Sequence, residues 1–552
     1  MKFFILALLT GCFLGLQPTD WENSMLELSG SFSLEEMSEE TVEHYRFLYE
    51  HPIDINKASL KALSSCGIFS RYQSASLKDW IERTGEIRSA TELSLVNGFS
   101  EGFVNLISPF ITISATSAPG SLKDRSLSAD LALRADLKYF KSRFSIDYGD
   151  LISGSVSTRN SNIPESFSLS CNLRNESLCI GDFNFSAGQG LVVWTGFTTS
   201  GASSATFCRN GTGITPGRGF SRSNRIRGVA YSHEGTVFGA RVAAGIDGTL
   251  VSNLQFRWRN GEAGASGVYR SGRLISGVDT KFNLSGFDFY SEAAFDFVAK
   301  APAVLSGCSY SPGYKEKYSL LARWYPANFS PVISGAMRSS SKCSDEAGVS
   351  AAATLKDFSV TADLSVHPEK KKRHLKIISS FSPEYHSGLW VLKPALRLTY
   401  RSHPDDRNGN RFDLRTDFSA IYGSWKISSR FNMVHCVSWS ELGYLESEYN
   451  VDKFSINVRA TLFDIQNWDD RIYVWQKDVA GTYNVPSFYG KGFSASAYLS
   501  YRKALSLRAS ATLYPDNPGK NGFELRLQYV KHFFHSDSSG TFDKNHRRRK
   551  RS

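Results

Sequence analysis

Apolar and polar side chains alternate along much of the chain after residue 114. The segment 412–422 places Phe, Leu, Thr, Phe, Ala and Tyr at every second position and separates most of them by Asp, Arg or Ser. The segment 523–529 alternates in the same way. Because successive side chains of a β-strand point to opposite faces, this spacing predicts strands with one apolar and one polar face.

Turn-forming sequences separate the predicted strands, as in 403–410 and 515–519, which are rich in Pro, Asp, Asn and Gly. Many such strands in one chain favour a transmembrane β-barrel over a soluble sandwich or a β-solenoid, which the alternation also allows. We assign the barrel to residues 114–536 and expect roughly 16–20 strands, at about 20–27 residues for each strand with its loop. A basic tail, 537–552, follows and ends in a run of Arg and Lys.

The N-terminus begins with Lys2 and a short apolar run, which is typical of a secretory signal peptide. We assign this peptide to residues 1–19. The run 9–12, Leu-Thr-Gly-Cys, also has the form of a lipoprotein cleavage box, in which Cys12 would be acylated; an ordinary signal peptide cut later would remove Cys12. Together with the barrel, export predicts a location in the bacterial outer membrane, with lipid as a partner.

Residues 20–50 form an acidic region with nine acidic residues and one basic residue, Arg46. We expect this segment to be helical, with Ser33 as an N-cap that is followed by several glutamates. Tyr45, Leu48 and Tyr49 stand at helical spacing and can share one apolar face. The segment therefore predicts a helix that packs through this face.

Residues 51–113 contain two copies of a short helix, a Gly turn and a second helix. Gly67 and Gly98 stand where the chain must reverse, a position that favours positive φ. Asn56 is a candidate cap of the first helix, and Ser89 with Glu92 has the spacing of a capping box. This pattern predicts a small all-α domain built from two helical hairpins.

The double hairpin resembles a tandem helix-hairpin-helix domain of the competence-protein type. The resemblance is carried by Ile55, Asn56, Ala58, Ser59 and Leu63 in the first copy; by Trp80, Ile81 and Gly85; by Ser89, Glu92, Leu93, Val96, Gly98 and Phe99 in the second copy; and by Leu106, Pro109, Phe110 and Ile111. The barrel region similarly resembles outer-membrane proteins that carry such domains, through the segments 181–197 and 224–228.

This resemblance implies a domain that holds the DNA backbone at the N–H groups of each hairpin, without reading sequence. The corresponding residues here are Gly67, Ile68, Phe69, Arg71 and Lys78 in the first copy, and Gly98, Phe99 and Ser100 in the second. The family's hairpin is G-x-G, and Phe69 and Ser100 replace its second Gly. A phenylalanine places a side chain where a phosphate must approach closely.

Charge divides the chain and leaves two functional hypotheses. Residues 20–50 carry a net charge of −8, residues 51–113 carry six basic and six acidic residues, and residues 114–552 carry +18. The first hypothesis is a periplasmic hairpin domain that binds DNA for binding or uptake, with affinity that depends on basic charge. The alternative is a structural or interaction protein, in which the acidic helical part docks on the barrel or on a periplasmic protein partner without touching nucleic acid.

Nothing in the sequence indicates an enzyme, a cofactor or a metal site. Residues 98–102 match G-x-S-x-G, but a nucleophile elbow needs a strand before the serine, and here a short helix is expected. Eight cysteines are scattered without zinc spacing. The predicted fold class is therefore α+β multidomain: a small all-α tandem helix-hairpin-helix domain followed by a large antiparallel transmembrane β-barrel.

Overall fold

The computed structural model covers two parts of the chain, 21–113 and 127–533. Within them it describes every residue except 30, 38, 51, 59–61, 64–65, 70, 150, 161–162, 174, 197–206, 210, 221, 223, 236, 259, 314, 403–408 and 452. The predicted signal peptide, Cys12 and the basic tail lie outside the described residues.

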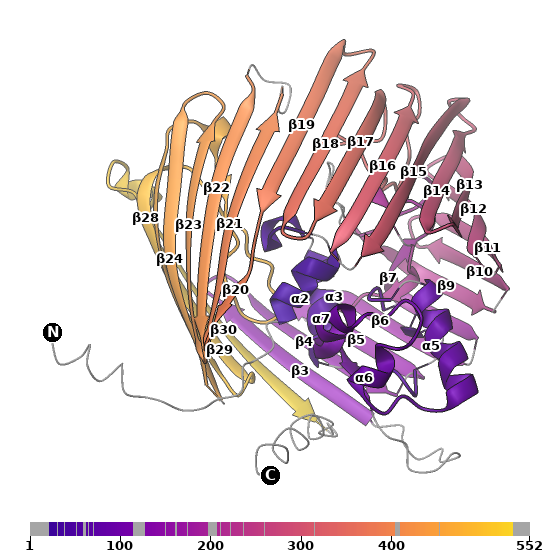
Figure 1. Ribbon diagram of the computed structural model, residues 1–552, viewed down its shortest axis with the longest axis horizontal. Coiled ribbons are helices and arrows are strands. Elements are labelled where there is room, and N and C mark those ends of the chain that lie inside the picture. The colour runs from indigo at the N-terminus through magenta and orange to yellow at the C-terminus, as the bar shows by residue number, and fades with distance from the viewer. Residues whose placement is uncertain are drawn as a thin grey trace.

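A closed antiparallel β-barrel of 24 strands forms most of the molecule (Figure 1). In order around the ring its strands are β3 (Leu127–Asp136), β4 (Phe140–Tyr148), β5 (Ile152–Arg159), β6 (Pro164–Leu173), β7 (Glu176–Ser186), β9 (Ile226–Glu234), β10 (Phe238–Gly245), β11 (Leu250–Trp258), β12 (Gly261–Arg270), β13 (Arg273–Leu284), β14 (Phe287–Asp296), β15 (Ala301–Gly313), β16 (Glu316–Tyr325), β17 (Glu346–Leu355), β18 (Phe358–His367), β19 (Lys372–Phe381), β21 (Trp390–Arg401), β22 (Arg411–Tyr422), β23 (Trp425–His435), β24 (Trp439–Val451), β25 (Phe454–Ile465), β28 (Gly490–Tyr501), β29 (Leu505–Leu513) and β30 (Gly522–Phe533). The first and last strands pair and close the ring.

Four short strands complete the sheet assignments of this region. β8 (Gly213–Pro216) pairs with β7, and β20 (Tyr385–Ser387) pairs with β21. β26 (Ile472–Tyr473) and β27 (Ser487–Phe488) pair with each other inside one long connection. These additions leave the ring closed, because β7 also pairs with β9 and β19 also pairs with β21.

The expected 16–20 strands are too few, and the reason is the length of the connections. At the end of the barrel where β3 begins and β30 finishes, nearly all connections are two or three residues long, such as 285–286 and 356–357. Each strand with its connection is therefore shorter on average than the sequence estimate assumed. We call the end where β3 begins and β30 finishes the terminal end of the barrel.

The opposite end carries the three longest connections, 187–225, 326–345 and 466–489. Because neighbouring strands run antiparallel, these three connections fall on the same side of the ring. We call this the long-loop end. Parts of all three connections fold inward, and these parts supply much of the packing inside the barrel.

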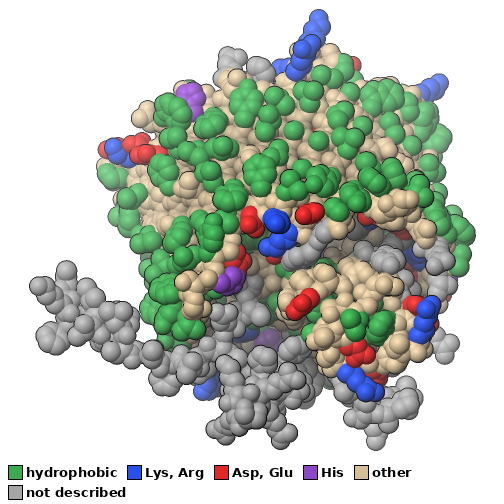
Figure 2. Space-filling view, viewed as in Figure 1, with side chains coloured by type: hydrophobic (Ala, Val, Ile, Leu, Met, Phe, Trp, Pro, Cys, Tyr) green, Lys and Arg blue, Asp and Glu red, His purple; other side chains and the backbone are tan. Residues whose placement is uncertain are grey.

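The outer face of the barrel is apolar, as the alternation predicted. In β22, Phe412, Phe418 and Tyr422 are exposed, whereas Arg415 and Asp417 point into the ring. Figure 2 shows hydrophobic side chains spread over the outer surface of the strands and most of the visible charges near its edges. In β22 the polar face of the strand therefore faces the lumen.

The N-terminal region folds into a compact unit, residues 21–113, which we call the helical module. Its elements are α2 (Trp21–Ser29), η1 (Leu34–Glu36), α3 (Glu39–Glu50), β1 (Ile53–Asp54), α5 (Arg71–Thr84), α6 (Ala90–Leu93), α7 (Glu101–Ile107), η2 (Ser108–Phe110) and β2 (Ile111–Thr112). β1 and β2 pair in parallel and bring the two ends of the double hairpin together. Among the described residues no helix has the length and apolarity that crossing a membrane requires.

Local features of the helical module agree with the sequence. Gly67 and Gly98 have φ of 75° and 88°, as expected where the chain reverses. The Ser89 hydroxyl accepts the N–H of Glu92, and the Ser100 hydroxyl accepts the N–H of Phe103, so both serines cap helices. The helices that flank the second Gly turn are therefore capped by neighbouring residues, whatever family the module belongs to.

The acidic region, residues 20–50, departs from the expected helix. Ser33 precedes only the short 3₁₀ turn η1 and makes no side-chain cap hydrogen bond, and the following Met37 is extended. The helix that carries the apolar face, α3, begins at Glu39. Tyr45 and Leu48 are buried in the core of the module, as predicted. The break at 33–37 turns two glutamates away from the module and toward the barrel.

Candidate functional site

The helical module lies inside the ring of strands (Figure 1). Three contacts between the module and the barrel show this placement. The carboxylate of Glu35 contacts Arg430 of β23, the carboxylate of Glu36 contacts Arg397 of β21, and Lys503, in a turn at the terminal end, lies over the ring of Tyr49 at 4.8 Å. The module therefore occupies the lumen and reaches the terminal end.

Glu35 is the centre of this contact. Its Oε1 lies 2.7 Å from Nη1 of Arg430, and its Oε2 lies 3.6 Å from Nη1 of Arg415. The backbone N–H of Trp475 also donates to Oε1 at 2.8 Å. The side chains of Glu35 and Arg430 are only 11% and 8% exposed, so this ion pair is shielded from water. Removing one partner of a buried ion pair of this kind strongly destabilises the folded structure.

The electrostatics of Glu35 follow from its neighbours. Burial alone would raise the pKa of the carboxyl, because it disfavours the charged form. The guanidinium groups of Arg430 and Arg415 and the Trp475 N–H outweigh burial and hold the pKa of Glu35 well below its usual range. Glu35 is therefore a carboxylate at neutral pH, and its charge is matched by the barrel.

Phe32 and Glu36 extend the contact along the wall. The Phe32 ring lies 5.2 Å from the guanidinium carbons of both Arg397 and Arg415, a cation–π arrangement with two arginines. The backbone N–H of Phe32 donates to Glu36 at 3.1 Å and keeps that carboxylate close to Arg397. We call residues 32–37 the acidic segment. It presents two carboxylates and one ring to three arginines.

A second part of the chain contacts the acidic segment from the long-loop end. Residues 472–488 fold back into the lumen as a hairpin that begins with β26 and ends with β27, and we call it the inner hairpin. The hydroxyl of Tyr483 lies 2.7 Å from the carbonyl oxygens of both Leu34 and Met37 and shares its hydrogen between them. Trp475 and Tyr483 also pack against the core of the module.

The inner hairpin is itself fixed to the barrel. Lys477 pairs with Glu448 of β24 at 2.6 Å, and Arg134 of β3 donates to the carbonyl of Ala480 at 2.6 Å. Asp478 pairs with Arg526 of β30. These contacts tie the hairpin to strands on both sides of it, so the hairpin joins the acidic segment to the wall at the long-loop end.

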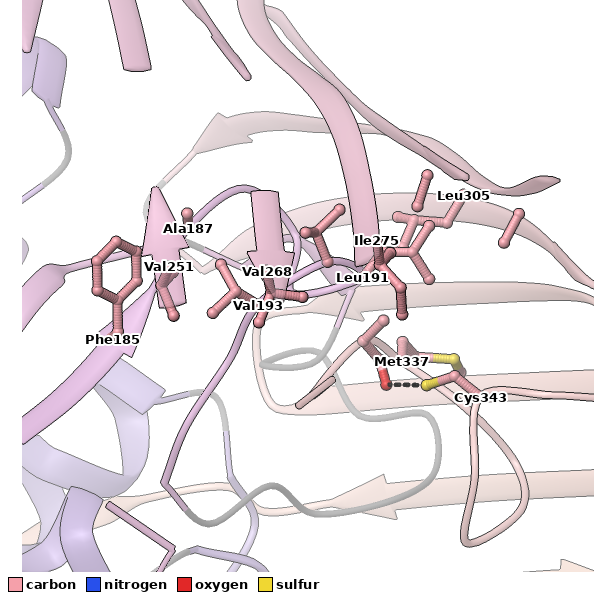
Figure 3. Packing of buried hydrophobic residues seen from close by; sticks show 14 of the residues in the cluster. Phe185, Ala187, Leu191, Val193, Val251, Val268, Ile275, Leu305, Met337 and Cys343 are labelled. Atoms are coloured by element: carbon pink, nitrogen blue, oxygen red, sulfur yellow. Dashed lines mark hydrogen bonds between the residues drawn. The ribbon is translucent and has the colours of Figure 1, made fainter. Parts of the chain in front are cut away.

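The opposite part of the lumen is filled by chain from another connection. Residues 187–196, which we call the inner loop, bring Leu191 and Val193 against Val251, Val268 and Ile275 of β11, β12 and β13 (Figure 3). These five side chains are almost fully buried. This side of the lumen is therefore closed by an apolar core.

A single buried carboxylate anchors the inner loop. Glu292 of β14 accepts the backbone N–H groups of Gln189, Leu191 and Val192 at 2.7, 3.0 and 2.9 Å. The loop thereby satisfies its own backbone donors in a buried position, where an unpaired donor is costly.

The first predicted DNA contact faces the barrel. Ile68 and Phe69 are buried in the core of the module. Gly67 and Phe69 also line a partly open cavity of about 140 Å³, together with barrel residues that include Arg241 and Asp279. Arg71 and Lys78 lie on α5, and the side chain of Lys78 is half-buried.

The second predicted DNA contact lies on the surface of the module. Gly98 and Ser100 are exposed, and Phe99 is buried against Phe69 and Phe103. Ser100 uses its hydroxyl as the cap of α7, so that oxygen accepts a backbone N–H. The structure thus places the two hairpins in different environments, one against the lumen wall and one exposed.

The residues that receive the acidic segment were not identified from the sequence. Arg397, Arg415 and Arg430 lie at alternate positions of their strands, and any polar residue at these positions would satisfy the alternating pattern. The one available signal was the recurrence of Arg at these lumen-facing positions, beside an N-terminal segment of opposite charge. That signal indicated docking on the barrel but not the strands that receive it.

Comparisons with known proteins give no family. No protein-family model matches the chain, and no curated protein matches it. The translocation pore of the P pilus usher PapC aligns with a TM-score of 0.35 at 10% identity, covering 74% of this chain and 99% of the usher pore. OccK10 (OpdN) of Pseudomonas aeruginosa aligns with a TM-score of 0.31 at 10% identity, covering 74% and 99%. A BenF-like porin from Pseudomonas fluorescens Pf-5 gives 0.31 at 10% identity, covering 75% and 100%.

These TM-scores are too low for a conclusion about function. The assignment of a β-barrel follows from the strand pairing of this chain, which closes without a gap from β3 to β30.

Proposed function

We propose that this chain is an outer-membrane β-barrel whose helical module is a releasable plug of the lumen. A closed ring satisfies every strand edge, and such a ring can cross lipid when its outer face is apolar. The outward positions carry exposed Leu, Val, Phe and Trp side chains on strands all around the ring. This outer face supports the membrane location.

The two ends of the barrel support an orientation. Bacterial outer-membrane barrels have short periplasmic turns and longer extracellular loops. By that rule the terminal end faces the periplasm, and the connections 187–225, 326–345 and 466–489 face the outside. In this orientation the helical module enters the lumen from the periplasmic side, and it sits within the lumen rather than beside the barrel.

The need for a plug follows from the size of the ring. Barrel diameter grows roughly linearly with strand number; barrels of about 16–18 strands already leave an aqueous channel, and those of about 22 carry a plug. A ring of 24 strands is wider still, and without a plug it would leave a larger aqueous channel. The observation that carries the proposal is Glu35, buried between Arg415 and Arg430 of the barrel wall. This charge pair holds the plug in its place.

Conductance of the full-length protein in planar bilayers tests the proposal. The unaltered protein should remain closed for most of the recording. Glu35→Gln removes the plug's carboxylate from Arg430 and Arg415, which keep only their pairs with Asp417 of the barrel. It should raise the fraction of time spent open by at least tenfold. Glu101→Gln is the matched control, because Glu101 is an exposed carboxylate of the same module.

Two results would contradict the proposal. A large constant conductance of the unaltered protein would show that the module does not close the lumen. Equal open fractions for Glu35→Gln and Glu101→Gln would show that the buried pair does not hold the module.

Nucleic-acid binding is the second candidate, and it concerns the exposed hairpin. Gly98 and Ser100 are accessible from the surface of the module, whereas Phe69 is not. We propose that any backbone contact with DNA, and any role in DNA uptake, uses this second hairpin. Titration of the full-length protein with duplex DNA at about 50 mM salt, where electrostatic binding is strongest, tests it. Absence of binding there would remove the candidate.

A further inference from the structure

The inner face of four neighbouring strands is strongly basic. Strand alternation and pairing place nine Lys or Arg side chains and only two acidic side chains on the lumen side of β19, β21, β22 and β23. The basic residues are Lys372, Lys376, Lys393, Arg397, Arg401, Arg411, Arg415, Lys426 and Arg430, and the acidic residues are Asp413 and Asp417. We call this surface the basic wall.

Like charges stand directly opposite each other across the strands of the basic wall. Arg397 pairs in register with Arg415, and Arg401 pairs in register with Arg411. Like charges at directly opposed positions are destabilising. Such a wall is therefore stabilised by anions that lie against it, and the plugged state supplies two of them, Glu35 and Glu36.

Neighbouring carboxylates neutralise the wall only in part. Glu384 pairs with Lys393 at 3.1 Å, and Glu448 of β24 stands directly opposite Lys426 while it also pairs with Lys477. Glu446 of β24 pairs with Arg459, which lies outside the four strands. Within the part of the chain that the structure describes, the buried Nε of Arg397 makes no hydrogen bond. Some capacity of the wall for anions therefore remains unused even with the plug in place.

The facing side of the lumen has no such excess. On the inner faces of β9 to β14 the ionisable side chains are five basic and six acidic. They are Arg241, Arg257, Arg270, Arg273 and Lys281, with Glu234, Glu262, Asp279, Asp288, Glu292 and Asp296. The basic surface is thus a property of one wall and not of the barrel as a whole.

We infer that the basic wall is the binding track for a linear polyanion, and that the acidic segment occupies the place of the polymer's anionic groups while the lumen is closed. This inference rests on the proposed plug function and names the substrate class of the same site. Arginine binds phosphate and carboxylate oxygens through paired N–H groups, and rings or rows of Arg and Lys select anions in pores. A flexible anionic chain could contact several of these arginines in succession.

The acidic segment then acts as a competitor of the polymer. A polyanion that enters the lumen offers many carboxylates or phosphates to the arginines that Glu35 and Glu36 occupy. Its binding and the docking of the plug exclude each other, because both use Arg397, Arg415 and Arg430. Arrival of the polymer thus favours release of the plug.

The test uses the full-length protein with Glu35→Gln and Glu36→Gln, in which the plug is released. In a KCl gradient this variant should show a reversal potential of anion-selective sign. Polyphosphate should block its current, and raising salt from about 50 to about 200 mM should weaken the block at least tenfold, as expected for polyanion binding. Dextran of similar length, which is uncharged, should not block. Polyuronate in place of polyphosphate separates a carboxylate polymer from a phosphate polymer.

A matched pair of substitutions locates the track. In the released background, Lys376→Gln removes one charge from the basic wall, and Lys281→Gln removes one from the facing wall. The first should weaken polyphosphate block several-fold, and the second should leave it within a factor of two. Equal effects of the two substitutions, or an open pore without anion selectivity and without polyphosphate block, would overturn the inference while leaving the plug intact as a proposal.

A direct binding measurement covers the case in which no current appears. Labelled polyphosphate is titrated into detergent-solubilised unaltered protein and into the double variant. The inference expects tighter binding to the double variant, because the competing carboxylates are gone. Equal or absent binding in both proteins would overturn it. Absence of conductance together with tighter binding would instead count against the plug and not against the track.

Discussion

The lumen is closed on two sides by different physical means. On β11 to β13 the chain closes it with its own inner loop, whose apolar side chains pack into an almost fully buried core. On β21 to β23 the chain closes it with the helical module, through ion pairs and one aromatic ring. Apolar packing of this kind is part of the folded barrel, whereas a contact made of charges responds to pH, salt and competing ions. The difference suggests one permanent closure and one reversible closure.

The largest effect should come from reversing a charge on the reversible side. Glu35→Lys places a cation against Arg415 and Arg430 and should destabilise docking by about 4 kcal/mol or more, since loss of one partner of a buried pair already costs about 3–5 kcal/mol. Bilayer conductance should then show a largely open protein that still folds as a barrel.

A reciprocal change provides the control. Arg430→Glu in the Glu35→Lys background restores an opposite-charge pair and should recover part of the closed fraction. If the double variant is as open as Glu35→Lys alone, the two residues do not act as a pair.

A core substitution should produce the opposite behaviour on the permanent side. Leu191→Ala removes a fully buried side chain from the inner loop and should lower the free energy of unfolding by about 3 kcal/mol. Thermal unfolding followed by heat-modifiable gel migration measures this. Leu254→Ala, on the outer face of β11, is the control and should cost less, because its side chain is half exposed.

The comparison predicts that Leu191→Ala lowers barrel stability equally at low and high salt. A salt-dependent effect would show that the inner loop is also held by charge, and the contrast between the two sides would then fail.

A smaller effect is expected at the contact with the inner hairpin. Tyr483→Phe removes one hydroxyl, which is shared between the carbonyls of Leu34 and Met37. One hydrogen bond contributes about 1 kcal/mol, so the open fraction should rise about fivefold. Tyr473→Phe, at the exposed base of the same hairpin, is the matched control. Equal changes in the two variants would remove the hairpin from the mechanism of closure.

The smallest effect should come from mild acidification. The pKa of Glu35 lies well below its ordinary value of 4.5, because Arg430 and Arg415 stabilise the carboxylate against the opposing effect of burial. Its contribution to docking is therefore complete above pH 4.5 and is lost only as pH falls through the lowered pKa. Between pH 7 and 5 the open fraction should not change through Glu35, and it should rise below that range.

The pH response has its own control. Glu35→Gln has no such step, so subtracting its pH profile isolates the contribution of Glu35 from that of other carboxylates. A step between pH 5 and 7 that disappears in Glu35→Gln would mean that the carboxyl is not held by the two arginines.

The sequence by itself determined the local elements. Period-2 alternation fixed which side chains of β22 face outward, because a strand can place successive residues only on opposite faces. Gly67 and Gly98 and the serine caps fixed the reversals and starts of the helices, because these depend on a few neighbouring residues. The opposite charges of the N-terminal segment and the barrel also allowed the docking hypothesis.

Only the tertiary structure decided the number of strands, the position of the module and its partners. The strand number depends on all the connection lengths together, and residues such as Glu35 and Arg430 are 395 positions apart in the chain. Sequence patterns report separations of a few residues, whereas these pairs exist only once the ring has closed around the module. For the same reason the first hairpin, which resembles a DNA contact when read alone, turns its Phe69 into the core of the module and toward the lumen wall.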